Sequence, residues 1–300
     1  MKLAMIGLGK MGGFMSERLM RAGHQVVAFD LSQDALDKLA AKGAQPASTL
    51  KDAIEALPSP RIAWVMLPDG PPTHDTIVEL ADLMSPGDII IDGGNTNYQI
   101  HIDTVSQVAS TGVQVLDAGT SGGVWGLENG YCLMVGGDES AYKLAEPIFL
   151  ALAPEGGCAR VGPVGAGHFV KMVHNGIEYG LMQAYAEGFE IMAAANEFDL
   201  DLHEISAIWR YGSVVRSWLL ELIELALADK KGFDEIEGVV TDTGEGRWTV
   251  EEAVRRAVPA PVITTSLFTR FASRDPNSFA NRLVSAMRHQ FGGHDVVKND

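Results

Sequence analysis

The chain has 300 residues, which is enough for two domains with separate hydrophobic cores. Hydrophobic residues make up 46% and charged residues 21% of it, which is typical of a globular protein and excludes an intrinsically disordered one. No apolar run reaches the ~20 residues of a membrane-spanning helix, and Gly7 comes too early for a secretory signal, so we expect a cytoplasmic protein.

The formal net charge is −16, from 39 acidic and 23 basic residues. A surface this acidic repels nucleic acid and anionic membranes, so neither is expected as a partner. An anionic substrate would need a local positive pocket, which makes clustered arginine and lysine informative. The two cysteines are too few for a disulfide framework and lie at no metal-ligand spacing, so no metal is expected.

In the first 160 residues, short apolar runs alternate with amphipathic stretches. The runs predict strands at residues 3–6, 25–29, 62–66, 89–92 and 113–116. The stretches between them predict helices at residues 11–21, 33–41, 73–84 and 102–110. Strands that alternate with helices indicate an α/β domain whose parallel sheet is covered on both faces.

After Gly165 the apolar positions follow the helical period, and no strand pattern remains. The predicted helices cover residues 166–196, 202–209, 217–227, 249–257, 261–273 and 279–291. The glycine-rich stretch at residues 161–167 breaks regular structure, so it marks the predicted boundary. We therefore expect a first domain at residues 1–164 and an all-α substrate and oligomerisation domain at residues 165–300.

The first predicted strand runs into a G-x-G-x-x-G turn that opens a helix. In this strand–turn–helix context the pattern predicts a dinucleotide site, and the sheet is then Rossmann-type and doubly wound. The helix N-terminus supplies N–H donors to the phosphates. The residues of this turn are Gly7, Leu8, Gly9, Lys10, Met11 and Gly12.

Asp30 ends the second predicted strand, about 20 residues past the glycines, where an acid binds the ribose hydroxyls of the adenosine. A carboxylate there repels a 2′-phosphate, and no arginine follows it, so NAD is favoured over NADP. The alternative role for Asp30 is to cap the next helix, which Ser32 could do instead.

Two further turns follow predicted strands at the sheet edge where ligands bind. Met66 and Leu67 belong to the first, and Asn95 to the second, in Asp-Gly-Gly-Asn. Asn95 offers both a donor and an acceptor to a ligand. Its alternative role is a helix cap.

Ser121, Gly122 and Gly123 come after the strand at 113–116 and a predicted turn at 117–120. A serine followed by two glycines can surround a carboxylate with hydroxyl and N–H donors. The same three residues also occur in plain loops.

The long predicted helix carries a varied polar stripe. Its members, spaced at i, i+3, i+4, i+7 and i+8, are Lys171, His174, Asn175, Glu178 and Tyr179. The opposite stripe, expected to be the packed face, holds Phe169, Val173, Ile177 and Leu181. An amine, an acid, an imidazole, an amide and a phenol together indicate a site, because a solvated face is normally rich in repeated lysine and glutamate. A partly buried lysine there could act as a general base. An exposed polar face remains the alternative.

Residues 165–180, GAGHFVKMVHNGIEYG, resemble the hallmark of decarboxylating 6-phosphogluconate dehydrogenases. The stretches at residues 91–95, 121–123, 246–249 and 291–294 resemble other motifs of that family, so the resemblance spans the chain. At 300 residues the chain is similar to the family's shorter form, which tends to prefer NAD.

The resemblance implies an NAD-dependent conversion of 6-phosphogluconate, a sugar-phosphate acid, to ribulose 5-phosphate and CO2. It implies that Lys171 takes the proton of the C3 hydroxyl and that Glu178 later protonates C1 of the enediol. The residues implied to hold the carboxylate and hydroxyls are Asn95, Ser121, Gly122, Gly123, His174 and Asn175.

The resemblance also implies a phosphate site with Tyr179, Arg270, Arg288 and His294. Two positions depart from the family pattern, since Thr243 and Glu245 replace a lysine and a threonine. Glu245 would repel a phosphate unless it turned away or Arg247 or Arg274 compensated. Surface ion pairs are the alternative role for the arginines.

Two other functions stay open. One is a non-decarboxylating β-hydroxyacid dehydrogenase such as the 3-hydroxyisobutyrate type, and the other is an inactive dinucleotide-binding protein. The apolar helical half predicts a symmetric assembly, either a homodimer or a homotetramer.

Overall fold

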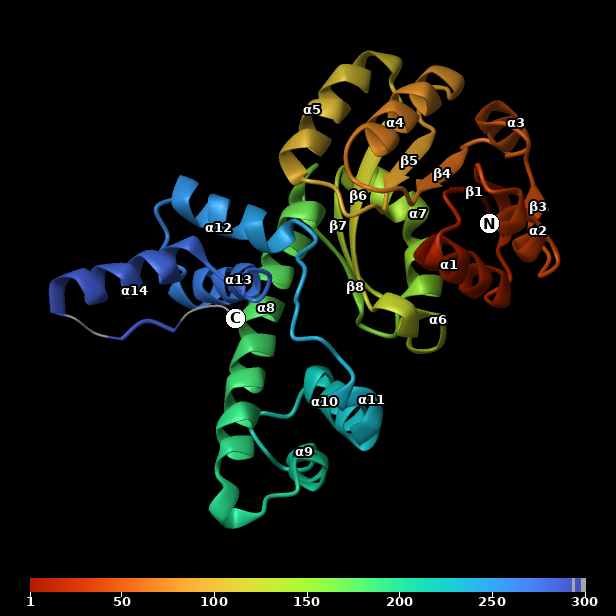
Figure 1. Ribbon diagram of the computed structural model, residues 1–300. Helices are drawn as coiled ribbons and strands as arrows, with labels where there is room; N and C mark the ends of the chain where they lie inside the picture. The colour runs from red at the N-terminus through yellow and green to blue at the C-terminus, as the bar shows by residue number, and fades with distance from the viewer. Residues whose placement is uncertain (293–294, 298–300) are drawn as a thin grey trace. The chain divides into compact units, whose positions relative to one another are not determined.

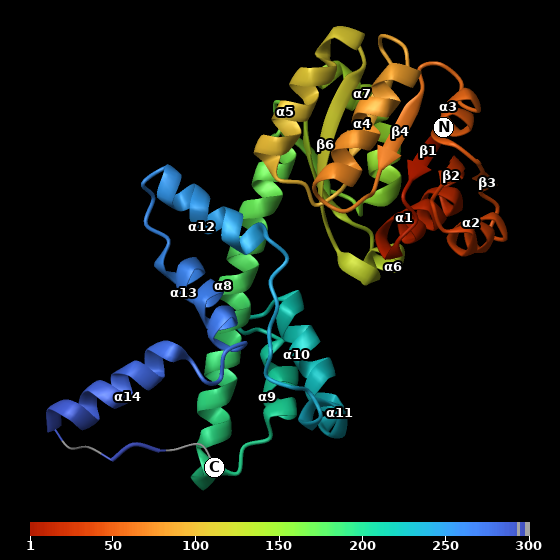
Figure 2. The same cartoon turned by 45° about the horizontal axis from the view of Figure 1, so that its top comes forward.

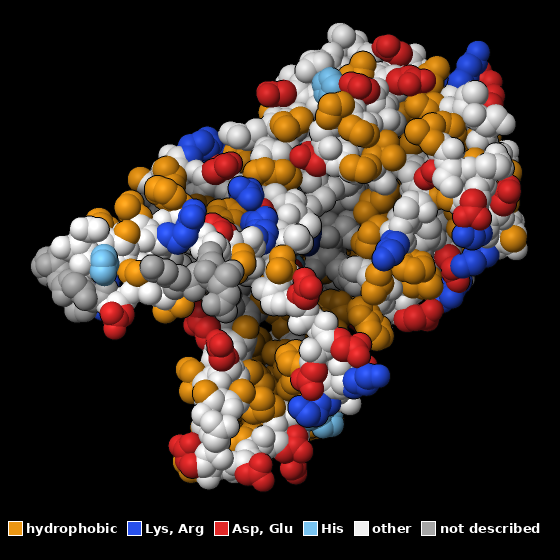
Figure 3. Space-filling model, in the orientation of Figure 1, with side chains coloured by type: hydrophobic (Ala, Val, Ile, Leu, Met, Phe, Trp, Pro, Cys, Tyr) orange, Lys and Arg blue, Asp and Glu red, His pale blue; other side chains and the backbone are white. Residues whose placement is uncertain are grey.

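The computed structural model describes residues 1–292 and 295–297, and it divides into two compact units, Met1–His174 and Asn175–Asp300. Figures 1 and 2 show the elements of both units in two orientations. On the face drawn in Figure 3, acidic and basic side chains are interspersed. Among the described residues, none of the helices is both long enough and apolar enough to cross a bilayer.

The first unit contains one eight-stranded sheet with the order β3-β2-β1-β4-β5-β6-β7-β8. The strands are β1 (Lys2–Ile6), β2 (Gln25–Phe29), β3 (Gln45–Pro46), β4 (Ile62–Val65), β5 (Ile89–Asp92), β6 (Gln114–Ser121), β7 (Cys132–Gly136) and β8 (Cys158–Gly162). Neighbouring strands are parallel except β6 and β7, which are antiparallel. The predicted Rossmann-type sheet is therefore confirmed, and it is mostly parallel, with one antiparallel pairing that the sequence did not indicate.

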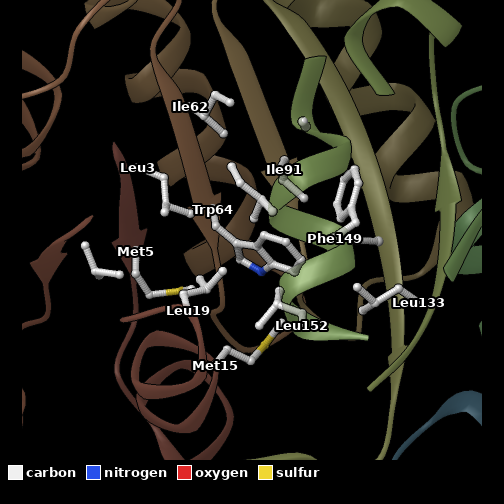
Figure 4. Close-up of a cluster of buried hydrophobic side chains, with 14 of the residues drawn as sticks. Leu3, Met5, Met15, Leu19, Ile62, Trp64, Ile91, Leu133, Phe149 and Leu152 are labelled. Atoms are coloured by element: carbon white, nitrogen blue, oxygen red, sulfur yellow. The ribbon is translucent and has the colours of Figure 1, made fainter. Parts of the chain in front are cut away.

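Helices cover both faces of this sheet (Figure 2). They are α1 (Lys10–Arg21), α2 (Gln33–Ala40), α3 (Leu50–Glu55), α4 (Pro71–Leu83), α5 (Tyr98–Val108), α6 (Gly126–Asn129) and α7 (Glu139–Leu152). Strand alternation explains the two cores. Leu3 and Met5 of β1 join one apolar cluster with residues of α1 and α7, while Ala4 and Ile6 join a second cluster with residues of α3 and α4. Figure 4 shows the first cluster gathered around the buried ring of Trp64.

Strand β6 corrects the predicted turn at residues 117–120. Those residues continue the strand, because Asp117 to Ser121 pair with Gly136 to Cys132 of β7. The Asp-Ala-Gly-Thr sequence is typical of a turn, but the antiparallel partner keeps it extended. Ser121 therefore ends the strand instead of following a turn.

The long helix is α8 (Ala166–Ala194), close to its predicted bounds. The predicted packed face is packed only in its first half: Phe169 meets the Tyr98 ring edge to face, whereas Ile177 and Leu181 are about half exposed. The buried positions include Met172 and Gly176, on another side of the helix. At Gly176 an added Cβ would lie 2.6 Å from the Thr249 side chain. The helix thus packs by close approach at glycine as well as through large apolar side chains.

The described part of the second unit contains helices and no strand. Besides the later part of α8, these are α9 (Leu202–Trp209), α10 (Trp218–Ala228), α11 (Lys230–Asp234), α12 (Glu245–Arg255), α13 (Pro261–Ala272) and α14 (Phe279–Gly292). Many apolar side chains here are exposed, among them Ile191, Ile208 and Val214. Figure 3 shows apolar side chains at the surface beside α8 and α10.

Candidate active site

The glycine turn joins β1 to α1 with very close backbone packing. Gly7 has a φ of +93°, and an added Cβ would lie 2.5 Å from the carbonyl oxygen of Met66. At Gly12 an added Cβ would lie 2.0 Å from the carbonyl oxygen of Gly7, whereas Gly9 has open space around it. No side chain caps α1, and its first turn carries no acid. Its N–H groups therefore suit a phosphate, and the remaining members of the turn, Leu8, Lys10 and Met11, flank that position.

Asp30 braces this turn. Its Oδ2 accepts a hydrogen bond from the backbone N–H of Leu8 at 2.6 Å, and its Oδ1 accepts one from Ser32 at 2.7 Å. Ser32 caps α2, because its side chain accepts from the N–H of Ala35. Asp30 is therefore not the cap of α2, and it lies at the carboxyl end of β2, beside the glycine turn.

Two loops at the ends of neighbouring strands carry the other predicted cofactor residues. Met66 and Leu67 follow β4 and are half-buried, and an added Cβ at Gly7 would lie 2.8 Å from a methyl carbon of Leu67. Asn95 follows β5 and is exposed. The cap of α5 is Asn97, whose side chain accepts from the N–H of Gln99, so Asn95 does not serve as that cap.

Lys171 lies where α8 approaches β6. An added Cβ at Gly119 would lie 2.5 Å from Cβ of Lys171 and 2.6 Å from the carbonyl oxygen of Gly167. Ser121 at the end of the same strand contacts His174, with Oγ 3.5 Å from Nε2. The structure therefore brings Ser121, Lys171 and His174 to one end of β6. Gly122 and Gly123 continue from Ser121, both with positive φ.

The later polar residues of α8 lie in the second unit. Glu178 is half-buried, and Tyr179 is buried against Gly246, where an added Cβ would lie 2.4 Å from the ring. The Nδ2 of Asn175 donates to Oε1 of Glu245 at 2.6 Å. Thr243 donates to the other carboxylate oxygen at 2.5 Å, so the buried Glu245 is hydrogen-bonded within the protein.

The predicted phosphate residues are partly brought together. The Arg270 guanidinium lies 3.4 Å from the centre of the Tyr179 ring and donates to the carbonyl oxygen of Thr241. The two arginines proposed to offset Glu245, Arg247 and Arg274, both pair with Asp242 and hold its pKa below its usual range, Arg247 more strongly. Arg288 is exposed on α14. His294 lies outside the described residues.

A buried polar cluster was not predicted. Asp92 and Asp117 stand opposite each other in the β5–β6 register, and His101 and His168 lie against them. Burial alone would raise the pKa of Asp92, but the charge of the nearby His168 ring and the hydrogen bond with His101 hold it well below its usual range. Burial opposes protonation of His168, yet the charge of Asp92 raises the pKa of that ring. The sequence signal for this cluster is that Asp92 and Asp117 each follow a buried apolar run, since buried acids need polar partners.

The glycine turn at the sheet switch point and the polar groups of α8 define the class of a dinucleotide-dependent oxidoreductase. Two family models match the chain. Residues 2–162 match the NAD binding domain of 6-phosphogluconate dehydrogenase, and residues 167–282 match the C-terminal domain of that enzyme.

Relatives match along the full length. YqeC of Bacillus subtilis, which carries the provisional name 6-phosphogluconate dehydrogenase, is 44% identical over 99% of this chain and 100% of its own. The NAD(+)-dependent, decarboxylating 6-phosphogluconate dehydrogenase of Haloferax volcanii is 42% identical over 100% of both chains. The chain therefore belongs to the 6-phosphogluconate dehydrogenase family.

One solved structure supports this assignment, and a second shares the fold. The 6-phosphogluconate dehydrogenase of Plasmodium falciparum superposes with a TM-score of 0.85 at 27% identity, covering 100% of this chain and 66% of the other. The 3-hydroxyisobutyrate dehydrogenase of Mycobacterium tuberculosis gives a TM-score of 0.71 at 23% identity, covering 91% and 94% of the two chains. The second similarity shows a shared fold only.

Proposed function

We propose that the chain oxidises and decarboxylates 6-phosphogluconate, giving ribulose 5-phosphate, CO2 and NADH. The observation that carries this proposal is the full-length similarity to an enzyme of that name, together with the family hallmark that α8 bears. The rival function, a dehydrogenase of the 3-hydroxyisobutyrate type, is supported only by the shared fold.

The proposed cofactor site is the glycine turn with Asp30, Met66, Leu67 and Asn95. The uncapped N-terminus of α1 and the open space at Gly9 fit the phosphates of a dinucleotide. NAD, when bound there, accepts the hydride that leaves C3 of the substrate. Asp30 would favour NAD over NADP through repulsion of a 2′-phosphate.

Lys171 and Glu178 are proposed to move the protons. Lys171 accepts the proton of the C3 hydroxyl as the hydride leaves, so that C3 becomes a ketone. The protonated Lys171 then polarises that ketone, which accepts the electron pair of the breaking C1–C2 bond as CO2 departs. Glu178 donates a proton to C1 of the resulting enediol, the carbon that was C2 of the substrate. The two residues lie two turns apart on α8, about 10 Å along its axis.

Other residues are proposed to hold the substrate. The carboxylate and hydroxyls would be bound by Asn95, Ser121, Gly122, Gly123, His174 and Asn175. The phosphate would be bound by Tyr179, Arg270, Arg288 and His294. The stacking of Arg270 on Tyr179 supports the second group, because it places a cation and a phenol hydroxyl in one cluster.

We further propose that residues 1–164 bind the cofactor, that residues 165–300 bind substrate and form the subunit contact, and that the protein works in the cytoplasm. The exposed apolar side chains of the helical part support a homodimer or homotetramer.

The test is to incubate the protein with 6-phosphogluconate and NAD while recording NADH absorbance and released CO2. We expect the two products in equal amounts. NADH without CO2 would indicate a non-decarboxylating relative. No NADH, with NAD binding intact, would indicate an inactive dinucleotide-binding protein.

A further inference from the structure

Four titratable side chains form a cluster inside the first unit that the proposed reaction does not use. Asp92 and Asp117 are 0% exposed, and His101 and His168 are 1% and 2% exposed. They come from four different elements, since Asp92 ends β5, His101 lies on α5, Asp117 lies on β6 and His168 lies on α8. Burying two carboxylates is costly, and an apolar core of the same volume is often at least as stable. Stability alone therefore does not explain the cluster.

Asp92 is the centre of the cluster. Its Oδ2 lies 2.9 Å from Nδ1 of His101 and 3.1 Å from Nε2 of His168. The two imidazole rings meet edge to face, with centroids 4.9 Å apart. The other oxygen, Oδ1, accepts from the backbone N–H of Gly94 at 3.1 Å and from Thr96 Oγ1 at 3.3 Å. One carboxylate thus holds the two residues that flank Asn95.

Asp117 holds the start of α8. Its two oxygens accept from the backbone N–H groups of Gly165 at 2.8 Å and His168 at 2.9 Å. These are N–H groups that the first turn of a helix leaves without helical partners, and a negative charge is stabilised there. His101 Nε2 lies 3.8 Å from Oδ1 of Asp117, so His101 lies between the two acids.

The cluster therefore connects two places that the proposed reaction needs fixed. One is the 93–96 turn with Asn95, and the other is the first turn of α8, three residues before Lys171. We propose that His101 and His168, held between Asp92 and Asp117, are positioning residues that keep Asn95 and Lys171 in the geometry of proton and hydride removal. This inference rests on the proposed function.

A bound cation is the rival explanation. His101, His168 and Asp92 each offer one ligand atom, and the three atoms lie within 4.8 Å of one another. We favour the hydrogen-bonded cluster, because Nδ1 of His101 and Oδ2 of Asp92 meet the geometry of a hydrogen bond at 2.9 Å.

A matched pair of variants tests the proposal. In His101→Asn the amide nitrogen takes the place of Nδ1, and in His101→Gln it takes the place of Nε2. Because Nδ1 makes the contact with Asp92, we expect His101→Asn to keep kcat near wild type. We expect His101→Gln to lose kcat by about tenfold to a hundredfold, since small misplacements of reacting groups cost rates of this order.

In His101→Gln the KM for NAD and the melting temperature should remain close to those of His101→Asn. Thr104→Val is the control, because Thr104 is equally buried on α5 but bonds His74 and its own helix. Its kcat should equal that of the wild type.

Equal kcat values for His101→Asn and His101→Gln would overturn the proposal, whether both are active or both impaired. One equivalent of tightly bound metal in the wild type, lost in both variants, would overturn it in favour of a cation site. A wild type that does not convert 6-phosphogluconate would instead contradict the proposed function.

Discussion

Two glycines of the first unit set how closely the backbone and Cβ of Lys171 approach strand β6. Gly119 and Gly167 let α8 approach β6 so closely that a methyl group at Gly119 would overlap Cβ of Lys171. The proposed base is therefore tied to the end of a central strand, next to Ser121 and His174. A catalytic amine on a rigid element can be placed within the tolerance that proton transfer needs.

Lys171→Met tests the proposed base. We expect kcat to fall by at least about a hundredfold, because a positioned general base contributes roughly that much. NAD affinity, measured by fluorescence titration, should not change. Lys143→Met, at an exposed lysine paired with Glu139, is the control and should keep full activity. Near-normal turnover by Lys171→Met would show that another group is the base.

Asp30→Ala tests cofactor choice. We expect the ratio of kcat/KM for NAD to that for NADP to fall by about tenfold or more, because two charges ~5 Å apart near a protein surface repel by about 3 kcal/mol. Activity with NAD should also fall, since the Leu8 N–H loses its acceptor. An unchanged ratio would refute a role for Asp30 in discrimination.

At the scale of elements, α8 shows what could be predicted and why the rest could not. Its bounds followed from the helical period of the sequence, but its packed face did so only in its first half. The prediction weighed large apolar residues, whereas the helix also packs through Gly167 and Gly176, which have no side chain to reveal a contact. Strand β7 was not predicted, because its pairing with β6 is long-range and no local sequence pattern indicates it.

The candidate site follows the same division. Motif spacing led to the glycine turn, Asp30 and the polar stripe of α8. It did not lead to His101, which is an isolated histidine in a helical stretch until the fold brings it against Asp92. The hydrogen bonding of Glu245 could not be predicted either. The side chains of Asn175 and Thr243 reach its carboxylate only because α8 packs against the start of α12.

Two glycine substitutions test the close approach of α8. Gly119→Ala should destabilise the protein by about 1–3 kcal/mol through overpacking and should lower kcat as Lys171 shifts. Gly188→Ala, on the same helix with nothing within 4 Å of the new methyl group, should stabilise it by about 0.5–1 kcal/mol. Urea unfolding and kcat measure both. Wild-type stability and kcat in Gly119→Ala would contradict the contact.

At the scale of the whole molecule, folding stability should depend on pH through the buried cluster. The pKa of His168 is raised above its ordinary value of 6.5 by Asp92, with Asp117 and Asp69 adding to the effect. Its contribution is therefore complete below pH 6.5 and is lost as pH rises through the raised pKa. Asp92, with its pKa held low, contributes above its ordinary value of 3.8 and loses that contribution only in stronger acid.

The measurement is the free energy of unfolding of the wild type and of His168→Gln between about pH 5.5 and about pH 8.5. The advantage of the wild type should be largest at the acid end of this range and should shrink toward the alkaline end. An advantage that grows with pH would mean that His168 is neutral in the folded protein.

Assembly is the other property of the whole molecule. Ile191 is 72% exposed on α8, within the apolar surface of the helical part. We expect sedimentation analysis to show a dimer or tetramer. Ile191→Asp should weaken it by about tenfold or more, because it would bury an unpaired charge. Leu150→Asp, at an exposed leucine of α7, is the control. A monomeric wild type would contradict the proposed assembly.

The boundary between the two compact units falls inside α8, between His174 and Asn175, so unbroken helix separates Lys171 from Glu178. One inserted residue there would rotate everything downstream by about 100°, whereas seven would return it to within about 20° of the original direction. Recombination between relatives therefore preserves the angle about the α8 axis between Lys171 and Glu178 only where the exchanged segments keep the number of residues between them. Insertions and deletions after the last turn of α8 do not change the angle between Lys171 and Glu178, so this family can vary in length there most easily.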